Sequence, residues 1–175
     1  SVSKVRMVPI GPLLRRYARV VRDVAVAFHK EAELIVSDQG VEVDNSLIEQ
    51  LKAPLMHMVR NAVHHGLETP DERKAAGKAV PARVTLSTRL EGDRFVVEMS
   101  DDGRGIDWQA VAARARSLGH AASTPEELTE ALFSDGLSTR EEASEHSGRG
   151  VGLGAVRQAC ERLGGRVEVE SRPGV

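Results

Sequence analysis

Two runs of alternating apolar and polar residues constrain the fold of this 175-residue chain more than any other feature. They cover residues 83–90 and 94–100, and Glu91-Gly92-Asp93 lies between them. Successive side chains of a strand point to opposite faces, so this alternation predicts a β-hairpin with one apolar face and one polar face. The rest of the chain must then supply elements that cover the apolar face.

Amphipathic helices are the elements that we expect to provide this cover. Apolar residues recur at helical spacing over residues 13–29. A second helix is predicted over residues 46–65, because Ser46-Leu47-Ile48-Glu49 has the capping-box pattern and Gly66 can end the helix. Shorter helices are expected over 108–118, 125–132 and 150–163.

Further extended segments are predicted over residues 32–36, 41–43 and 166–170, with residues 1–12, 67–81 and 134–150 as irregular connections. The helices and strands do not follow a regular βαβ alternation. We therefore predict an α+β fold, a two-layer α/β sandwich in which helices cover one face of a mixed, mostly antiparallel sheet.

The composition excludes several classes of protein. A net charge of −2 and an aromatic content of 3% argue against nucleic-acid binding. The chain has no apolar run long enough to insert into a membrane. Its single cysteine, Cys160, cannot form an internal disulfide, which favours a cytoplasmic setting.

Polar residues capable of chemistry lie along one side of the predicted helix 46–65. They are His57, Asn61, His64 and His65, spaced three and four residues apart. Such a stripe is often only a solvated face. However, an asparagine carbonyl can bind Mg²⁺ that is also held by phosphates, and a histidine one turn earlier can accept a proton. Zinc is disfavoured, because the HExxH spacing is absent.

Two glycine clusters follow later in the chain. Asp101-Asp102-Gly103-Arg104-Gly105 comes directly after the hairpin and could be a simple turn. Alternatively, Asp101 at the strand end could accept a hydrogen bond from the adenine amine. Gly148-Arg149-Gly150-Val151-Gly152 precedes a predicted helix, where backbone amides suit phosphate. Neither cluster fits a Walker A motif or a Rossmann fingerprint.

Taken in order, these motifs resemble the ATP-binding (Bergerat-type) fold shared by histidine kinases, DNA gyrase, Hsp90 and MutL. The sequence of residues 57–68, with a histidine four residues before Asn61, resembles that of the CheA-type chemotaxis kinases. Further matching segments are Val5–Ile10, Val20–Asp23, Pro70, Glu72, Arg73, Gly77, Lys78, Phe133–Thr139, Ser147–Gly152 and Leu163–Gly165.

The resemblance implies roles for the matching positions. Asn61 would bind Mg²⁺, and His57 and His65 would contact the phosphates or assist phosphoryl transfer. Asp101 and Gly105 would bind adenine. The other positions expected to contact the nucleotide are Gly103, Ile106, Ser138, Thr139, Gly148, Arg149, Gly150, Val151, Gly152 and Arg157.

The resemblance also implies a function for the chain. It would be a kinase domain that transfers the terminal phosphate of ATP to a histidine on a separate phosphotransfer domain, for signalling to a response regulator. Receptor or coupling proteins would bind to other domains. Residues 1–12 would be the end of a dimerization domain or linker, and residues 13–175 the catalytic domain without its last strand. We expect the full-length protein to be a homodimer and this fragment a monomer.

The sequence departs from the family at four positions. His64 and Gly154 replace aspartates, Asp135 replaces a proline and Leu137 replaces a phenylalanine. These changes leave open a second hypothesis, a weak or inactive nucleotide-binding regulatory module. A third hypothesis is an ATPase of the gyrase, Hsp90 or MutL kind, but those enzymes have a glutamate where this chain has His57.

Overall fold

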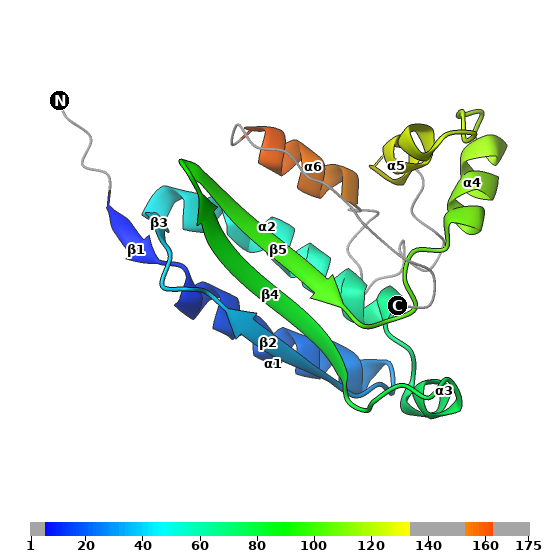
Figure 1. Cartoon of the computed structure of the whole chain (residues 1–175), viewed down its shortest axis with the longest axis horizontal. Helices are drawn as coiled ribbons and strands as arrows, with labels where there is room; N and C mark the ends of the chain where they lie inside the picture. Colours follow the sequence, from blue (N-terminus) through cyan, green and yellow to red (C-terminus); the bar gives the residue numbers. More distant parts are fainter. Residues whose placement is uncertain (1–5, 134–152, 163–175) are drawn as a thin grey trace. The chain divides into compact units, whose positions relative to one another are not determined.

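The computed structural model describes residues 6–133 and 153–162. The chain forms two compact units, residues 1–104 and residues 105–175. The sheet and the long helices belong to the first unit (Figure 1).

The first unit is a sheet covered on one face by helices. Strands β2 (Ala32–Ser37), β4 (Ala82–Glu91) and β5 (Arg94–Asp101) form a sheet in the order β2-β4-β5. β2 pairs with β4 in parallel, and β4 pairs with β5 antiparallel. Figure 1 shows helices α1 (Gly11–Ala27) and α2 (Asn45–Asn61) on the same face of this sheet. The predicted α+β class, hairpin and mixed sheet are confirmed.

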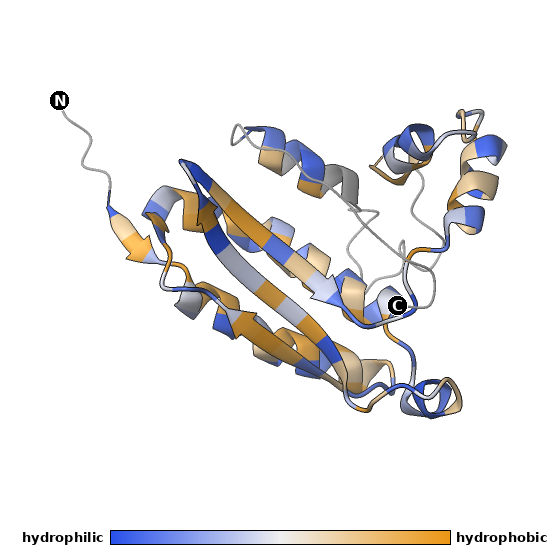
Figure 2. Ribbon diagram, viewed as in Figure 1, coloured by the Kyte–Doolittle hydropathy of each residue, from blue (hydrophilic) through white to orange (hydrophobic). Residues whose placement is uncertain are grey.

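The alternation along β4 decides which side chains enter the core. Ala82, Val84, Leu86 and Thr88 are buried, and the residues between them are more exposed. Figure 2 shows the accompanying alternation of hydropathy along β4. Met99 pairs with Leu86, and Asp101 pairs with Val84. Paired residues point to the same face. Asp101 therefore continues an inward-facing series and carries a carboxylate to the covered side of the sheet.

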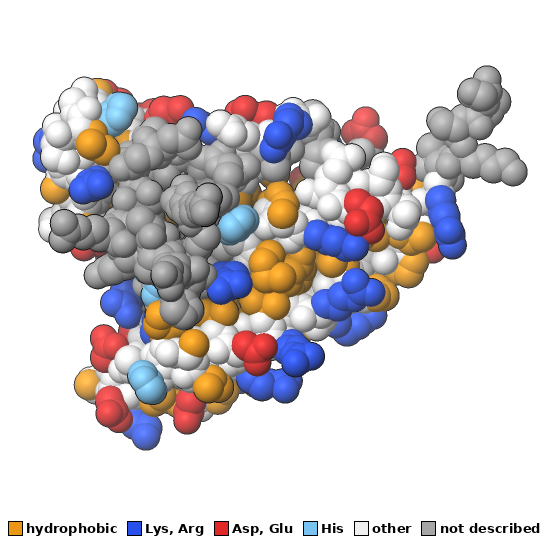
Figure 3. All heavy atoms as spheres, turned by 180° about the vertical axis from the view of Figure 1, so that it is seen from behind, with side chains coloured by type: hydrophobic (Ala, Val, Ile, Leu, Met, Phe, Trp, Pro, Cys, Tyr) orange, Lys and Arg blue, Asp and Glu red, His pale blue; other side chains and the backbone are white. Residues whose placement is uncertain are grey.

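Helix α1 separates an apolar face from a basic one. Leu14, Tyr17 and Val21 are buried at helical spacing, and the Tyr17 hydroxyl donates to the carbonyl oxygen of Lys52 on α2 at 2.9 Å. Burial raises the pKa of Tyr17 to about 12, so this hydroxyl stays a donor. Lys and Arg side chains gather over the helical face in Figure 3, and α1 contributes exposed Arg15, Arg16, Arg19 and Arg22.

Helix α2 begins one residue earlier than predicted, and its cap is Asp44 rather than Ser46. The Asp44 carboxylate accepts from the Ser46 amide at 2.9 Å. Asp44 also ends β3 (Glu42–Asp44), which pairs with β1 (Met7–Pro9), so the strand leads directly into the helix. The predicted irregular segment 1–12 thus contains a short strand, because β3 offers it an antiparallel partner.

The predicted connection 67–81 contains a helix that the sequence analysis did not predict. Helix α3 (Pro70–Ala75) has a complete capping box, in which Thr69 and Glu72 each bind the other's backbone amide. Six residues are too few to produce a helical repeat of apolar positions, so the periodicity was uninformative there.

The second unit contains α4 (Trp108–Ser117), α5 (Pro125–Phe133) and α6 (Leu153–Arg162). A small alanine-rich core packs α4 against α5, formed by Ala112, Ala115, Ala122 and Ala131. The predicted loop 134–150 and strand 166–170 lie outside the described residues, as do Asp135 and Leu137. Within the part of the chain that the structure describes, no helix has the length and apolarity to cross a membrane.

Candidate functional site

Asp101 is the central residue of the candidate site in the first unit. It ends β5, and its Oδ1 accepts from the Gly103 amide at 2.9 Å. Burial raises its pKa above the ordinary value, and the nearby charges of Asp102 and Glu68 act in the same direction. The Gly103 hydrogen bond and the Lys78 charge oppose them. A partly buried carboxylate with a free acceptor oxygen suits a ligand that brings its own hydrogen-bond donor.

A close backbone contact brings this carboxylate to the end of the long helix. A Cβ atom on Gly103 would lie 2.1 Å from the carbonyl oxygen of Gly66, at the end of the π-helical turn η1 (Ala62–Gly66). The same carbonyl accepts from the Arg104 amide at 2.8 Å. Only glycine permits this approach. Gly103, which we expected to contact the nucleotide, thus packs against the end of the helix in this structure.

The helix side of the site carries the predicted histidines and Asn61. His57 and Asn61 are half-buried and four residues apart on α2. Burial and the neighbouring Arg60 charge lower the pKa of His57, which favours its neutral form. The neutral imidazole can accept a proton or hydrogen bond through one nitrogen and donate through the other.

The predicted helix continues through His65, but its last turn is a π-helix. His64 and His65 therefore do not keep the α-helical spacing on which the predicted stripe was based. The His64 ring stacks on Phe28 with ring centroids 3.7 Å apart, and its centroid is 3.9 Å from that of His65. Wider helical turns of this kind are frequent at functional sites.

Lys30 holds the end of this turn, and the sequence analysis missed it. Its Nζ donates to the carbonyl oxygens of Val63 at 3.0 Å and His64 at 2.5 Å. These are among the carbonyls left without helical partners at a helix C-terminus. Burial and the Arg104 charge lower the pKa of Lys30, whereas Glu72 and Glu68 raise it. No local sequence pattern marks Lys30, because its partners lie more than 30 residues away.

The side chains at the end of this helix are suited to Mg²⁺ that is also bound by phosphate groups. Asn61 offers a neutral side-chain oxygen, and His64 offers imidazole nitrogens. Among the residues that the structure describes, no three His, Cys, Asp or Glu side chains gather as a metal cluster. Such a chain can supply one ligand to Mg²⁺ that phosphate and water otherwise surround.

The remaining predicted positions belong to the second unit or to undescribed segments. Gly105 has φ +77°, which favours glycine, and Ile106 is half-buried. Arg157 pairs with Glu130 at 2.8 Å and lies 5.1 Å from the centre of the Phe133 ring. Outside the described residues lie Ser138, Thr139, Gly148, Arg149, Gly150, Val151 and Gly152.

Comparison with known families agrees with this arrangement. Residues 50–175 match the model of the histidine kinase-, DNA gyrase B- and HSP90-like ATPases. The chain belongs to this family. The matched region begins inside α2 and includes His57, Asn61 and Asp101.

Among curated proteins, the chain is similar to the chemotaxis protein CheA. It is 40% identical to CheA of Rhizobium meliloti over 99% of the chain, and 42% identical to CheA of Treponema pallidum over 98%. It is also 38% identical to the gliding motility regulatory protein of Myxococcus xanthus over 99% of the chain. The chain spans 24%, 22% and 23% of these relatives, about a quarter of their length.

Solved structures agree on the fold. The nucleotide-free catalytic domain of histidine kinase ThkA has a TM-score of 0.61 and 17% identity, with 98% of this chain and 90% of that one covered. The histidine kinase domain of Erythrobacter litoralis EL346 has a TM-score of 0.51 and 17% identity, with 99% and 61% covered.

The Gly66–Gly103 contact predicts an asymmetry between two alanine variants. Gly103→Ala places a methyl group against the Gly66 carbonyl, so we expect a loss of roughly 2–4 kcal/mol in the free energy of unfolding. Gly66→Ala is the matched control, because its Cβ would lie 3.7 Å from Asp101, an ordinary contact. Urea denaturation measures both, and equal stabilities would contradict the contact.

The raised pKa of Asp101 predicts a pH-dependent cost to stability. The carboxyl group of Asp101 binds its proton more tightly in the folded chain than in the unfolded chain. Its contribution to the free energy of unfolding therefore favours folding below pH 3.8 and is lost as the pH rises through the raised pKa. We expect Asp101→Asn to raise the unfolding midpoint at neutral pH by about 2–4 °C, the effect of roughly 1 kcal/mol in a chain of this size.

Thermal unfolding followed by circular dichroism checks this expectation. The gain should shrink as the pH falls through the raised pKa of Asp101 toward 3.8, because the carboxyl group of the folded chain becomes neutral above 3.8. Asp102→Asn is the matched control. It weakens the 3.0 Å ion pair of Asp102 with buried Arg73, and should lower the midpoint. A fall in the midpoint for both variants would show that Asp101 does not oppose folding.

Proposed function

We propose that this chain is the ATP-binding kinase domain of a CheA-like histidine kinase. The observation that carries the proposal is the Asp101 carboxylate, which lies on the covered side of the sheet beside the end of the Asn61-bearing helix. Membership of the ATPase family and the similarity to CheA support it.

Asp101 would select adenine over guanine. An ionised carboxylate is an acceptor only, and the exocyclic amine of adenine is a donor. Guanine presents a carbonyl oxygen at the same position, so two acceptors would face each other. Because burial makes the unpartnered charge costly, the wrong base would lose a hydrogen bond and gain repulsion. Gly103, Gly105 and Ile106 would lie beside the base.

The helix residues would serve the phosphate end of the nucleotide. Asn61 would hold Mg²⁺, which neutralises phosphate charge when bound. His57 and His65 would bind phosphate oxygens or orient the incoming nucleophile. Arg157, Ser138, Thr139 and the glycine cluster 148–152 with Arg149 and Val151 would flank the phosphates.

The reaction would be phosphoryl transfer to a histidine on a separate phosphotransfer domain. The acceptor imidazole nitrogen would form a bond to the terminal phosphorus as the bond to the bridging oxygen breaks, and ADP would leave with the negative charge. Positioning and charge neutralisation would supply most of the rate. The phosphoryl group would then pass to a response regulator in a cytoplasmic pathway.

A second candidate function is nucleotide binding without catalysis. The observation that favours it is His64, which stacks on Phe28 where the family has an aspartate. The site then has one anionic group fewer near the phosphates. This domain would hold ATP as a regulatory module and transfer no phosphate.

Calorimetric titration of a non-hydrolysable ATP analogue tests the binding step. We expect the unaltered chain to bind the analogue in the presence of Mg²⁺, and Asp101→Asn to bind it roughly 10–100-fold more weakly, the effect of one hydrogen bond to a charged group. Asn61→Ala should lose the dependence on Mg²⁺. The guanine analogue is the ligand control, and equal affinity for both bases would contradict the role of Asp101.

Addition of a compatible phosphotransfer domain separates the two candidate functions. We expect radiolabel from ATP to appear on that domain and none on this chain alone, because the acceptor histidine lies elsewhere in the family. Bound nucleotide without any labelled acceptor would favour the regulatory module. Steady hydrolysis without an acceptor would instead indicate a gyrase-like ATPase.

A further inference from the structure

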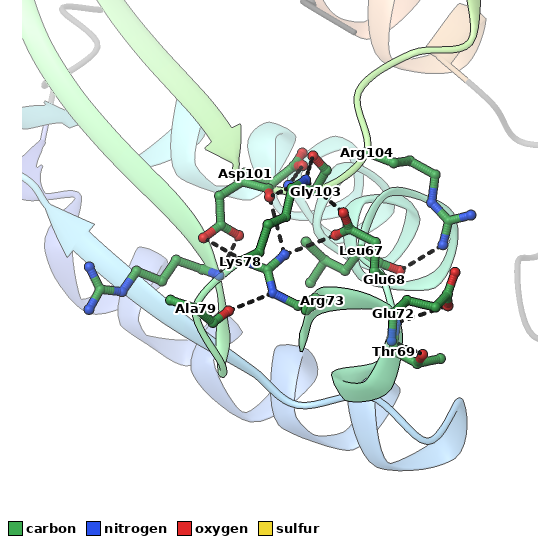
Figure 4. A network of polar contacts seen from close by, with 12 residues as sticks. Leu67, Glu68, Thr69, Glu72, Arg73, Lys78, Ala79, Asp101, Gly103 and Arg104 are labelled. Atoms are coloured by element: carbon green, nitrogen blue, oxygen red, sulfur yellow. Dashed lines mark hydrogen bonds and ion pairs between the residues drawn. The ribbon is translucent and has the colours of Figure 1, made fainter. Parts of the chain in front are cut away.

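Three charged residues between α2 and β4, two buried and one half-buried, form a network beneath the Asp101 loop. They are Glu68, Arg73 and Lys78, shown with their neighbours in Figure 4 and called the clamp below. We propose that Arg73 and Lys78 are positioning residues for base recognition, which hold the backbone of Asp102 and Gly103 so that the Asp101 carboxylate keeps its orientation. This inference rests on the proposed nucleotide site.

Arg73 anchors the clamp from α3. Its side chain is only 2% exposed, and its guanidinium donates to Glu68 at 2.9 Å and to the Ala79 carbonyl at 2.7 Å. It also reaches the loop after β5, where it contacts the Asp102 carbonyl at 3.1 Å and the Asp102 carboxylate at 3.0 Å. The rigid guanidinium thereby joins α3 to that loop through several directed hydrogen bonds.

Lys78 adds a second cation against the same backbone. Its Nζ donates to the Glu68 carboxylate at 2.6 Å, the Gly103 carbonyl at 2.9 Å and the Asp102 carbonyl at 3.3 Å. Lys78 therefore holds the carbonyls of two consecutive residues of the loop, and shares that of Asp102 with Arg73. Burial by itself would raise the pKa of Glu68, but the Lys78 hydrogen bond and the Arg73 charge lower it, so the anion of the clamp is stable.

The clamp touches the residue that orients Asp101. The Gly103 carbonyl accepts from Lys78, and the Gly103 amide donates to Asp101 at 2.9 Å. A shift of Gly103 would therefore move the hydrogen bond that fixes one oxygen of the carboxylate. Lys78 also lowers the pKa of Asp101, which favours the ionised acceptor form. Loss of Lys78 would thus disturb both the position and the charge state of the acceptor.

Hydrogen exchange in the nucleotide-free chain tests the clamp without any ligand. We expect Lys78→Met to speed exchange of the Gly103 amide by about tenfold or more, because the loop opens more often once its anchor is lost. Amides inside β4 should keep their rates. Lys74→Met is the matched control, since Lys74 is exposed on α3. Unchanged exchange at Gly103 in Lys78→Met would overturn the proposal.

Titration with ADP and GDP then tests the effect on recognition. Lys78→Met should weaken ADP binding by about tenfold, as for loss of one charged hydrogen-bond network, and weaken GDP binding less. The ratio of the two affinities should therefore fall. Lys78→Arg, which keeps the charge and several donors, should recover most of that ratio, and Lys74→Met should match the unaltered chain.

The outcomes separate the clamp from the proposed function. If the unaltered chain binds no ADP, the proposed function fails, and the exchange result still decides whether the clamp holds the loop. If the unaltered chain prefers ADP and Lys78→Met keeps the same preference, the positioning role is wrong. If Lys78→Met lowers the unfolding midpoint but leaves the ratio of ADP affinity to GDP affinity unchanged, the clamp only stabilises the fold.

Discussion

The contact between the Gly66 carbonyl and Gly103 is the constraint on which the site depends. It joins the last turn of the Asn61-bearing helix to the loop after β5, two segments more than 30 residues apart, at a distance that excludes any side chain. The contact therefore fixes the end of this helix against the loop that follows Asp101. In the proposed nucleotide site, this packing would place the phosphate-binding helix relative to the base-binding strand end.

The charges near this contact include one that the proposed base recognition needs and that the fold disfavours. Asp101 is a carboxylate at an inward-facing position, and its raised pKa shows that the fold disfavours its ionised form. Buried Glu68 and Arg73 form an ion pair nearby, and Lys78 completes the charge balance. A buried ion pair adds little net stability but strongly penalises the loss of one partner. The network is therefore better suited to fixing a geometry than to strengthening the fold.

The end of the helix is held by the segment after α1. The His64 ring stacks on Phe28, which follows α1 directly. Lys30 follows two residues later and binds the carbonyls of Val63 and His64. The segment after α1 thus supplies both an apolar partner for the His64 ring and a cation for the helix C-terminus, where the carbonyl dipoles favour positive charge.

Local patterns in the sequence were enough to predict the hairpin, the long helices and the place of Asp101 at the end of a strand, because periodicity, capping and turn residues act between near neighbours. These patterns gave the wrong cap for α2, which is Asp44. They also missed α3, because six residues offer too few positions for a helical repeat. The family resemblance marked Arg73 and Lys78 without a role. Their hydrogen bonds to the loop after β5 and the anchoring of the π-helical turn by Lys30 are contacts between distant segments. Only the folded chain brings these segments together, since burial and the register of β4 against β5 set which charges meet.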